Sequence, residues 1–204
     1  MLAIIDYGVG NLTSILNMFK RLGVDACITS DLETIRKADR LMIPGVGHFD
    51  KCMQNFNASG LRPVIEEIKK EGGTPILGIC VGAQMMTRRS EEGVESGLGW
   101  VEADTVRFQP DPSLGLKVPH MGWADVSAGN DPSPLWKNVP EEPRFYFAHS
   151  YHFRFYGEDL TTATCDYGYS FTCAFQKGNI FGLQFHPEKS HRFGMSILTN
   201  FAAL

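Results

Sequence analysis

The sequence Gly78-Ile79-Cys80-Val81-Gly82 follows the apolar run Pro75-Ile76-Leu77 and precedes a helix-like segment from Ala83 to Arg88. A strand, a turn of small residues and a helix form the setting of a nucleophile elbow, in which glycines permit a sharp turn and leave room for a substrate. Backbone N–H groups and the positive end of the helix would stabilise a thiolate at Cys80 and then an oxyanion. The stretch therefore predicts cysteine-based acyl transfer, although a single such match also fits an ordinary buried cysteine.

A second motif, Gln184-Phe185-His186-Pro187-Glu188, supplies the partners that a nucleophilic cysteine needs. Residues two apart on an extended segment point to the same side, and Pro187 biases His186 toward extended geometry. A carboxylate beside a histidine fixes its tautomer and stabilises the imidazolium that forms when the ring takes a proton. The pair alone also fits a strand end with a satisfied histidine. Together with the elbow, it predicts a triad of Cys80, His186 and Glu188.

The first half of the chain alternates between apolar strand patterns and amphipathic helix patterns, which predicts a parallel sheet covered on both faces. The expected strands are Leu2–Asp6, Val24–Thr29, Arg40–Ile43 and Ile76–Ile79, and the expected helices are Asn11–Leu22, Asp31–Ala38 and Leu61–Glu71. Ligands bind such sheets at the carboxyl ends of the strands. Cys80 and the sequence Pro44-Gly45-Val46-Gly47 both fall at those ends.

The second half contains short aromatic and β-branched runs, which predict an antiparallel extension of the sheet. These runs are Trp100–Phe108, Arg144–His149, Thr161–Cys165, Phe171–Phe175 and Ile180–Phe185. Asn130–Pro143 is rich in proline and is predicted to be a surface loop, and Ser190–Leu204 is predicted to be the last helix. With no linker or repeat in view, the chain is expected to fold as one α/β domain over residues 1–204.

The composition excludes several classes of protein. The 204 residues carry a net charge of −4, with 43% hydrophobic and 21% charged residues, which fits a globular fold and argues against a general nucleic-acid binder. No apolar run has membrane-spanning length, and the first residues resemble a strand rather than a signal peptide. The five cysteines form no Cys-x-x-Cys pair, which argues against disulfides or a zinc site and favours a reducing cytoplasm. No metal and no cofactor are expected.

Several smaller features have both a functional and a structural interpretation. The loop Pro44-Gly45-Val46-Gly47 fits an oxyanion hole or an ordinary strand–helix turn. Gln84 fits a substrate ligand or a surface residue. His149 competes with His186 as the base but lacks an acid two residues later. The sequence His120-Met121-Gly122-Trp123 is expected in a loop, where Trp123 is either part of a partner surface or half-buried.

Together, the motifs resemble the class I (triad) glutamine amidotransferases, and within them the glutaminase subunits of imidazole glycerol phosphate synthase. The resemblance spans the whole chain in order. It rests on Asp6-Tyr7-Gly8-Val9-Gly10-Asn11-Leu12, Pro44–Gly47, Gly78–Gly82, Ser90–Gly93, Pro119-His120-Met121-Gly122-Trp123, His149–Tyr151 and Gln184–Ser190. It implies the flavodoxin-like three-layer fold of these enzymes, with a mostly parallel central sheet.

The resemblance also implies a role for each matching residue. Cys80 would attack the side-chain amide of glutamine, with His186 as base and Glu188 orienting it. The remaining implied residues are Val46, Gly47 and Val81 for the oxyanion hole and Gln84, Glu92, His149, Ser150 and Tyr151 for glutamine. Asn11, Trp123 and Lys189 are the candidates for the partner interface, since each adjoins a catalytic strand end. The ammonia would pass to a (β/α)-barrel cyclase subunit in a heterodimer.

Some positions depart from the family pattern, and other functions stay open. Ala83, Ala124 and Ala148 replace the usual Met, Asn and Val, and the run from Glu188 to Met195 also resembles a paralogous branch that supplies ammonia to amidino- or amino-sugar synthesis. A cysteine peptidase or deglycase of related fold would share the elbow but not the glutamine-binding segments. A non-catalytic binding module would have no need of the intact Cys80, His186 and Glu188.

Overall fold

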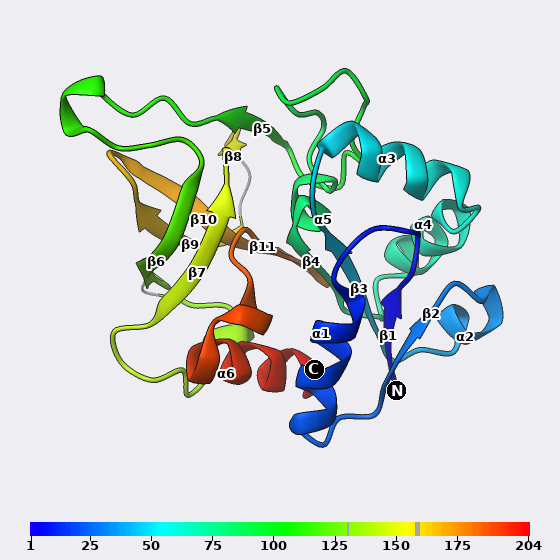
Figure 1. Ribbon diagram of the computed structural model, residues 1–204. Helices are drawn as coiled ribbons and strands as arrows, with labels where there is room; N and C mark the ends of the chain where they lie inside the picture. The colour runs from blue at the N-terminus through cyan, green and yellow to red at the C-terminus, as the bar shows by residue number, and fades with distance from the viewer. Residues whose placement is uncertain (130, 158–159) are drawn as a thin grey trace.

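A computed structural model describes residues 1–129, 131–157 and 160–204, and it has the mixed sheet with flanking helices that the sequence predicts (Figure 1). The first half contains β1 (Leu2–Ile5), α1 (Leu12–Arg21), β2 (Ala26–Thr29), α2 (Leu32–Arg36), β3 (Arg40–Gly45), α3 (Phe49–Ala58), α4 (Arg62–Glu71), β4 (Ile76–Cys80) and α5 (Val81–Gln84). In this half the strands lie in the order β2-β1-β3-β4.

The second half contains mainly strands. It comprises β5 (Ala103–Arg107), β6 (His120–Ser127), β7 (Arg144–His149), β8 (Tyr151–Phe155), β9 (Thr161–Asp166), β10 (Ser170–Lys177), β11 (Ile180–Leu183), the 3₁₀ turns η1 (Pro112–Leu114), η2 (Pro134–Trp136) and η3 (Pro187–Lys189), and α6 (His191–Ala202). β11 lies parallel to β4 and antiparallel to β10. The full strand order is β2-β1-β3-β4-β11-β10-β9-β6-β7, with β8 pairing both β10 and β5. β11 therefore joins the parallel half to the antiparallel extension.

The parallel strands are apolar on both faces because helices cover both sides of this half. Every residue of β1 and of β4 is buried. Figure 1 shows α1 and α6 on one side of the sheet and α3 and α4 on the other. The predicted Asp31 cap is present, since its side chain accepts a hydrogen bond from the N–H of Thr34. Local capping and the apolar pattern therefore agree, as in most stable folds.

An aromatic core joins α6 to the antiparallel extension. Phe145 of β7 and Phe185 stack with their ring centroids 4.0 Å apart, and Trp136 of η2 meets the ring of Phe145 edge-on. Phe193 of α6 also contacts Phe145. Buried aromatic pairs of this kind dominate core energetics. This packing fixes the segment after β11, which carries His186.

Several local predictions are wrong, and each error has a tertiary cause. The helix expected over Ala83–Arg88 ends at Gln84, because the following backbone instead bonds to the segment around Leu98 and Ala103. His120–Trp123 is not a loop but the start of β6, because its residues pair with β7.

Two further corrections concern the second half of the chain. Asn130 of the predicted Asn130–Pro143 loop lies outside the described residues, and within the rest η2 buries Leu135 and Trp136 in the core. His186 is extended as predicted, but Glu188 follows in a 3₁₀ turn rather than on an extended strand. In the described residues, no helix has the length and apolar character needed to cross a membrane.

Candidate active site

Cys80 occupies a strained turn at the carboxyl end of β4. Its φ is 53° and its ψ is −115°, in a region that residues with a side chain seldom adopt. Three glycines make this turn possible. A Cβ at Gly82 would lie 1.9 Å from the oxygen of Ile43, one at Gly45 would lie 2.3 Å from the nitrogen of Gly82, and one at Gly78 would lie 2.7 Å from Ala83. The elbow is therefore held by direct backbone contact between the ends of β3 and β4.

We expect Gly82→Ala to damage the site by forcing β3 and β4 apart. Overpacking a core contact typically costs about 1–3 kcal/mol, and the shift would also displace Cys80. Gly73→Ala is the matched control, because no atom lies within 4 Å of a Cβ built there. Chemical denaturation and glutamine hydrolysis would both be measured. Equal stability and activity of the two variants would contradict a packed elbow.

The predicted base and its orienting acid are in contact. Nδ1 of His186 lies 2.8 Å from Oε1 of Glu188, and both side chains are 4% exposed. Since an ionised carboxylate only accepts, Nδ1 carries the proton and Nε2 is left for Cys80. Burial lowers the pKa of His186, but hydrogen bonds to Cys80 and Glu188 outweigh it and raise this pKa from 6.5 to about 9. The ring is therefore suited to accept a proton from the thiol.

A cavity of about 370 Å³ opens beside Cys80 and gathers most of the residues that the sequence singles out. It is lined by Val46, Gly47, Cys80, Val81, Gln84, Glu92, Pro119, Met121, Ala148, His149, Ser150, Tyr151, His186 and Lys189. Glu188 lies behind His186, and Asn11 and Trp123 are not part of the lining. All the residues predicted to bind glutamine or hold the oxyanion therefore face one space, which is of the usual size for a small-molecule site.

Gln84 is buried rather than on the surface, and its amide orientation is fixed. Its Nε2 donates to the carbonyl oxygen of Tyr151 at 3.3 Å and to Oε1 of Gln184 at 3.0 Å. Both hydrogens of Nε2 are then engaged, so Oε1 is the atom left for a ligand. Gln84 therefore offers the cavity an acceptor, which suits an ammonium or amide N–H group.

His149 has different surroundings from His186, the other candidate for the base. Its Nδ1 lies 2.7 Å from the carbonyl oxygen of Tyr151, which only accepts, so Nδ1 carries the proton. Burial lowers the pKa of His149 to about 3, so the ring is neutral near pH 7. Aromatic rings of Phe108 and Phe147 enclose it. The competition between His149 and His186 is thus decided by their surroundings.

Glu92 lines the cavity and also joins it to α3. Its Oε2 accepts a hydrogen bond of 2.8 Å from the backbone N–H of Phe49, the first residue of that helix. A carboxylate at a helix N-terminus is stabilised by the unsatisfied N–H groups there. Glu92 therefore has a defined position at the cavity wall, with a negative charge that suits a ligand ammonium group.

The loop after β3 is anchored through its carbonyl groups. The hydroxyl of Tyr7 donates to the carbonyl oxygen of Pro44, and the thiol of Cys52 donates to that of Val46 at 3.5 Å. Tyr7 and Cys52 are both buried. Because N–H and C=O of a trans peptide point in opposite directions, the N–H of Gly47 is directed away from the core. This arrangement is compatible with an oxyanion donor at the cavity wall.

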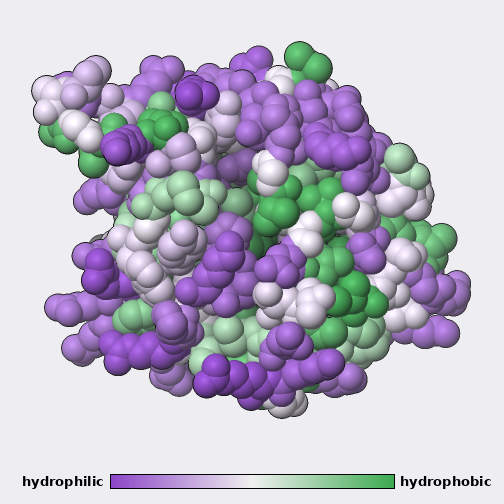
Figure 2. All heavy atoms as spheres, in the orientation of Figure 1, coloured by the Kyte–Doolittle hydropathy of each residue, from purple (hydrophilic) through white to green (hydrophobic). Residues whose placement is uncertain are grey.

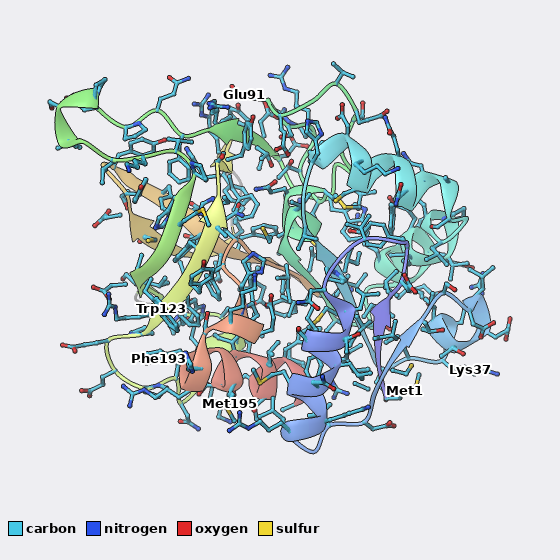
Figure 3. The ribbon with its side chains drawn as sticks, viewed as in Figure 1. Met1, Lys37, Glu91, Trp123, Phe193 and Met195 are labelled. Carbon is cyan, nitrogen blue, oxygen red and sulfur yellow. The ribbon has the colours of Figure 1, made fainter. Side chains whose placement is uncertain are left out.

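A mixed apolar and basic surface borders the cavity mouth. Val46, Met121 and Trp123 are exposed there by 40%, 64% and 40%. Figure 2 shows apolar surface near the centre of this face of the molecule, and Figure 3 places Trp123 on β6. The indole of Trp123 stacks on His191 with centroids 5.3 Å apart, and Lys189 lies over the ring of Tyr146. Asn11 is exposed at the start of α1, where its side chain makes no cap bond.

Three residues hold this site together although no role was predicted for them. Tyr7, Cys52 and Gln184 are buried and bond to the end of β3, to the loop after it or to Cys80 itself. Tyr7 and Gln184 lie in quoted motifs and Cys52 does not, but the contacts of all three depend on segments far away in the chain. Across residues 1–129, 131–157 and 160–204, no group of three or more His, Cys, Asp or Glu side chains could hold a metal ion.

Comparisons with known proteins identify the family and the fold. The family model described as class-I glutamine amidotransferase matches residues 3–203. Imidazole glycerol phosphate synthase subunit HisH 2 of Pseudomonas aeruginosa is 47% identical over 204 residues, covering 100% of both chains. The subunit HisH of Bdellovibrio bacteriovorus is 42% identical over 205 residues, again covering 100% of both. A crystal structure of a glutamine amidotransferase shares the fold, with a TM-score of 0.74, 20% identity and 99% of each chain covered. The predicted family and fold class are thereby confirmed, and the chain belongs to the class I glutamine amidotransferases.

Proposed function

We propose that this chain is the glutaminase subunit of an imidazole glycerol phosphate synthase. The observation that carries the proposal is the joint placement of Cys80, the His186–Glu188 pair and the predicted glutamine ligands around one cavity. Full-length relatives at 42–47% identity bear the name of this synthase subunit, which supports the same assignment. The whole chain would act as one glutaminase domain.

In the proposed reaction, Cys80 Sγ attacks the side-chain amide carbon of glutamine while His186 Nε2 takes the thiol proton. The tetrahedral oxyanion is held by backbone N–H groups of Val81 and of the Val46–Gly47 segment. The C–N bond then breaks as His186 returns the proton to the leaving nitrogen, which departs as ammonia. Water, deprotonated by His186, attacks the thioester, and the C–S bond breaks to release glutamate.

The proposed glutamine pose follows from the polarity of the cavity wall. The negative Glu92 and the acceptor oxygen of Gln84 suit the N–H-rich groups of the substrate. The segment His149–Tyr151 would supply backbone contacts to the amino-acid end, beside the neutral ring of His149. A site that offers acceptors to an amide disfavours the carboxylate of the product glutamate, which helps product release.

We infer that a (β/α)-barrel cyclase subunit binds over the cavity mouth and receives the ammonia unreleased to solvent. Asn11, Trp123 and Lys189 are the proposed contacts, with Val46 and Met121 adding exposed apolar surface. The cyclase would form imidazole glycerol phosphate and aminoimidazole carboxamide ribonucleotide. The five free cysteines are consistent with work in a reducing cytoplasm.

A different acceptor for the ammonia is favoured by one feature of the surface proposed to bind the partner. His191 begins α6 with a φ of 47° and stacks on Trp123. The next residue after Trp123 is Ala124, which replaces the Asn that is usual in the family. This face thus differs from the usual family pattern where the barrel would dock. The alternative is a paralogous amidotransferase that supplies ammonia to amidino- or amino-sugar synthesis for surface polysaccharides, with the same glutaminase chemistry.

The isolated chain is expected to be a poor glutaminase that its partner activates. The glycines of the Pro44–Gly47 loop permit two backbone states, of which one aims an N–H group at the oxyanion, and a liganded partner can bias that equilibrium. Loss of one oxyanion donor costs roughly a hundredfold or more in rate. Glutamine hydrolysis would be measured with and without the cyclase and its nucleotide ligand. Full turnover by the lone chain would favour a stand-alone hydrolase instead.

A further inference from the structure

The nucleophile has a hydrogen-bond donor that the triad does not include. Nε2 of Gln184 lies 3.8 Å from Sγ of Cys80, within the range for a hydrogen bond to sulfur. Gln184 follows β11 directly, and its backbone N–H donates to the carbonyl oxygen of Cys173 at 2.8 Å. Its side chain is fully buried and does not line the cavity. Gln184 therefore touches the reacting sulfur without being placed to touch substrate.

The orientation of the Gln184 amide is determined by its neighbours. The carbonyl oxygen of Tyr151 can only accept, so Gln84 must present its Nε2 to it. The same Nε2 faces Gln184 at 3.0 Å, so Gln184 must present its Oε1 to Gln84. The nitrogen of Gln184 is then the atom that remains for Cys80. The carbonyl oxygen of Tyr151 thus determines the direction of the hydrogen bonds that run through the side-chain amides of Gln84 and Gln184 to the sulfur of Cys80.

Within the glutaminase reaction proposed above, we propose that Gln184 is a further catalytic residue that stabilises the Cys80 thiolate through its Nε2–H group. Aligned amides polarise one another, so the bond from Gln84 strengthens the donor that Gln184 presents. A hydrogen bond to the ionised form of a group favours that form. These hydrogen bonds also connect Cys80 to the His149–Tyr151 segment, because the carbonyl oxygen of Tyr151 accepts from His149 as well.

Other ionisable groups near Cys80 also influence its ionisation, and their influence can be separated from that of Gln184. His186 from the turn after β11, Tyr7 after β1 and Cys52 of α3 interact electrostatically with Cys80. Glu92, His149, Tyr151 and Lys189 line the same cavity and are the same in every variant. Burial raises the pKa of Tyr7 well above its usual value, and burial raises that of Cys52 to about 11. Both stay neutral between about pH 5 and pH 10. His186 titrates in every variant, so a difference between variants reports on residue 184.

The test is the rate of Cys80 alkylation by iodoacetamide as a function of pH, followed by peptide mass spectrometry. We expect Gln184→Leu to raise the midpoint of this profile by about one pH unit, the size of one charge-assisted hydrogen bond. Gln184→Glu keeps an acceptor for Gln84 and replaces the N–H donor at Cys80 with a carboxylate oxygen, so it should shift the midpoint further. Gln176→Leu is the matched control, since the Gln176 amide bonds only to the surface carbonyl of Gly178 among the described residues.

Steady-state kinetics with the partner provide the second readout. At neutral pH, kcat should fall about tenfold in Gln184→Glu while KM for glutamine is unchanged, because this variant keeps the acceptor for Gln84 and residue 184 is outside the cavity. A folded Gln184 variant with the wild-type alkylation midpoint would overturn the role of Gln184 and leave the glutaminase proposal standing. Absence of alkylation at Cys80 in the wild-type chain would instead overturn the proposed nucleophile, and this role with it.

Discussion

Cys80→Ala and Cys80→Ser are expected to abolish glutamine-dependent synthesis, while the assembled enzyme still uses added ammonia. Cys80 stands at the elbow and borders the cavity with His186, so the thioester cannot form without it. Loss of a triad nucleophile typically lowers the rate by roughly 10⁴ or more. Serine is a poor substitute, because its hydroxyl is a much weaker acid than a thiol.

The measurement is product formation by the complex with glutamine or with ammonium salt as nitrogen source. Cys27→Ala is the control, since Cys27 is on the edge strand β2, with its thiol bonded to Met1. Its glutamine-dependent rate should match that of the wild type. Glutamine hydrolysis near the wild-type rate in Cys80→Ala would show that the nucleophile lies elsewhere.

Glu188→Gln is expected to lower turnover by roughly 10²–10⁴-fold while glutamine binding is retained. The carboxylate holds the proton of His186 on Nδ1, whereas an amide can donate to Nδ1 and favour the wrong tautomer. The pKa of His186, which the Glu188 bond helps to raise to about 9, should fall in the variant. A raised pKa favours the imidazolium form of His186, which accompanies the Cys80 thiolate. A lower pKa in the variant therefore leaves less of Cys80 as thiolate.

Three measurements check the Glu188 prediction: single-turnover kinetics, glutamine binding by calorimetry, and the NMR titration of the His186 ring. Glu67→Gln is the control, because Glu67 pairs with Arg36 on the surface. An unchanged His186 titration would contradict the orienting role of Glu188. A loss of glutamine binding would place Glu188 in contact with substrate instead.

The elbow and the triad were predictable because their signals are local. Glycines beside Cys80 and a carboxylate two residues after His186 point to the proposed chemistry without knowledge of the fold. The spacing of Phe49, Cys52, Met53 and Phe56 was also a helical signal, and all four are buried in α3, a helix that the sequence analysis did not predict. That omission was an error of pattern reading rather than a limit of the sequence.

Other features depend on contacts that no local pattern contains. Gln184 and Cys80 are 104 positions apart, so the bond between them follows from the pairing of β11 with β4. His120–Trp123 is a strand because β7 lies beside it, although its own residues suggested a loop. Gln84 fits a surface or a buried position equally well until Tyr151 and Gln184 are placed around it. Tertiary contacts outweigh weak local preferences in each case.

The stacking of Trp123 on His191 gives the chain an optical reporter at its proposed docking face. Of the three tryptophans, Trp100 and Trp136 are buried, with 3% and 8% exposure, whereas Trp123 is 40% exposed. Water around an indole shifts its emission to longer wavelength, so the red edge of the fluorescence spectrum arises from Trp123. A subunit that covers the indole shifts this emission toward the blue. Association with a partner subunit can thus be followed by intrinsic tryptophan fluorescence, without an added dye or label.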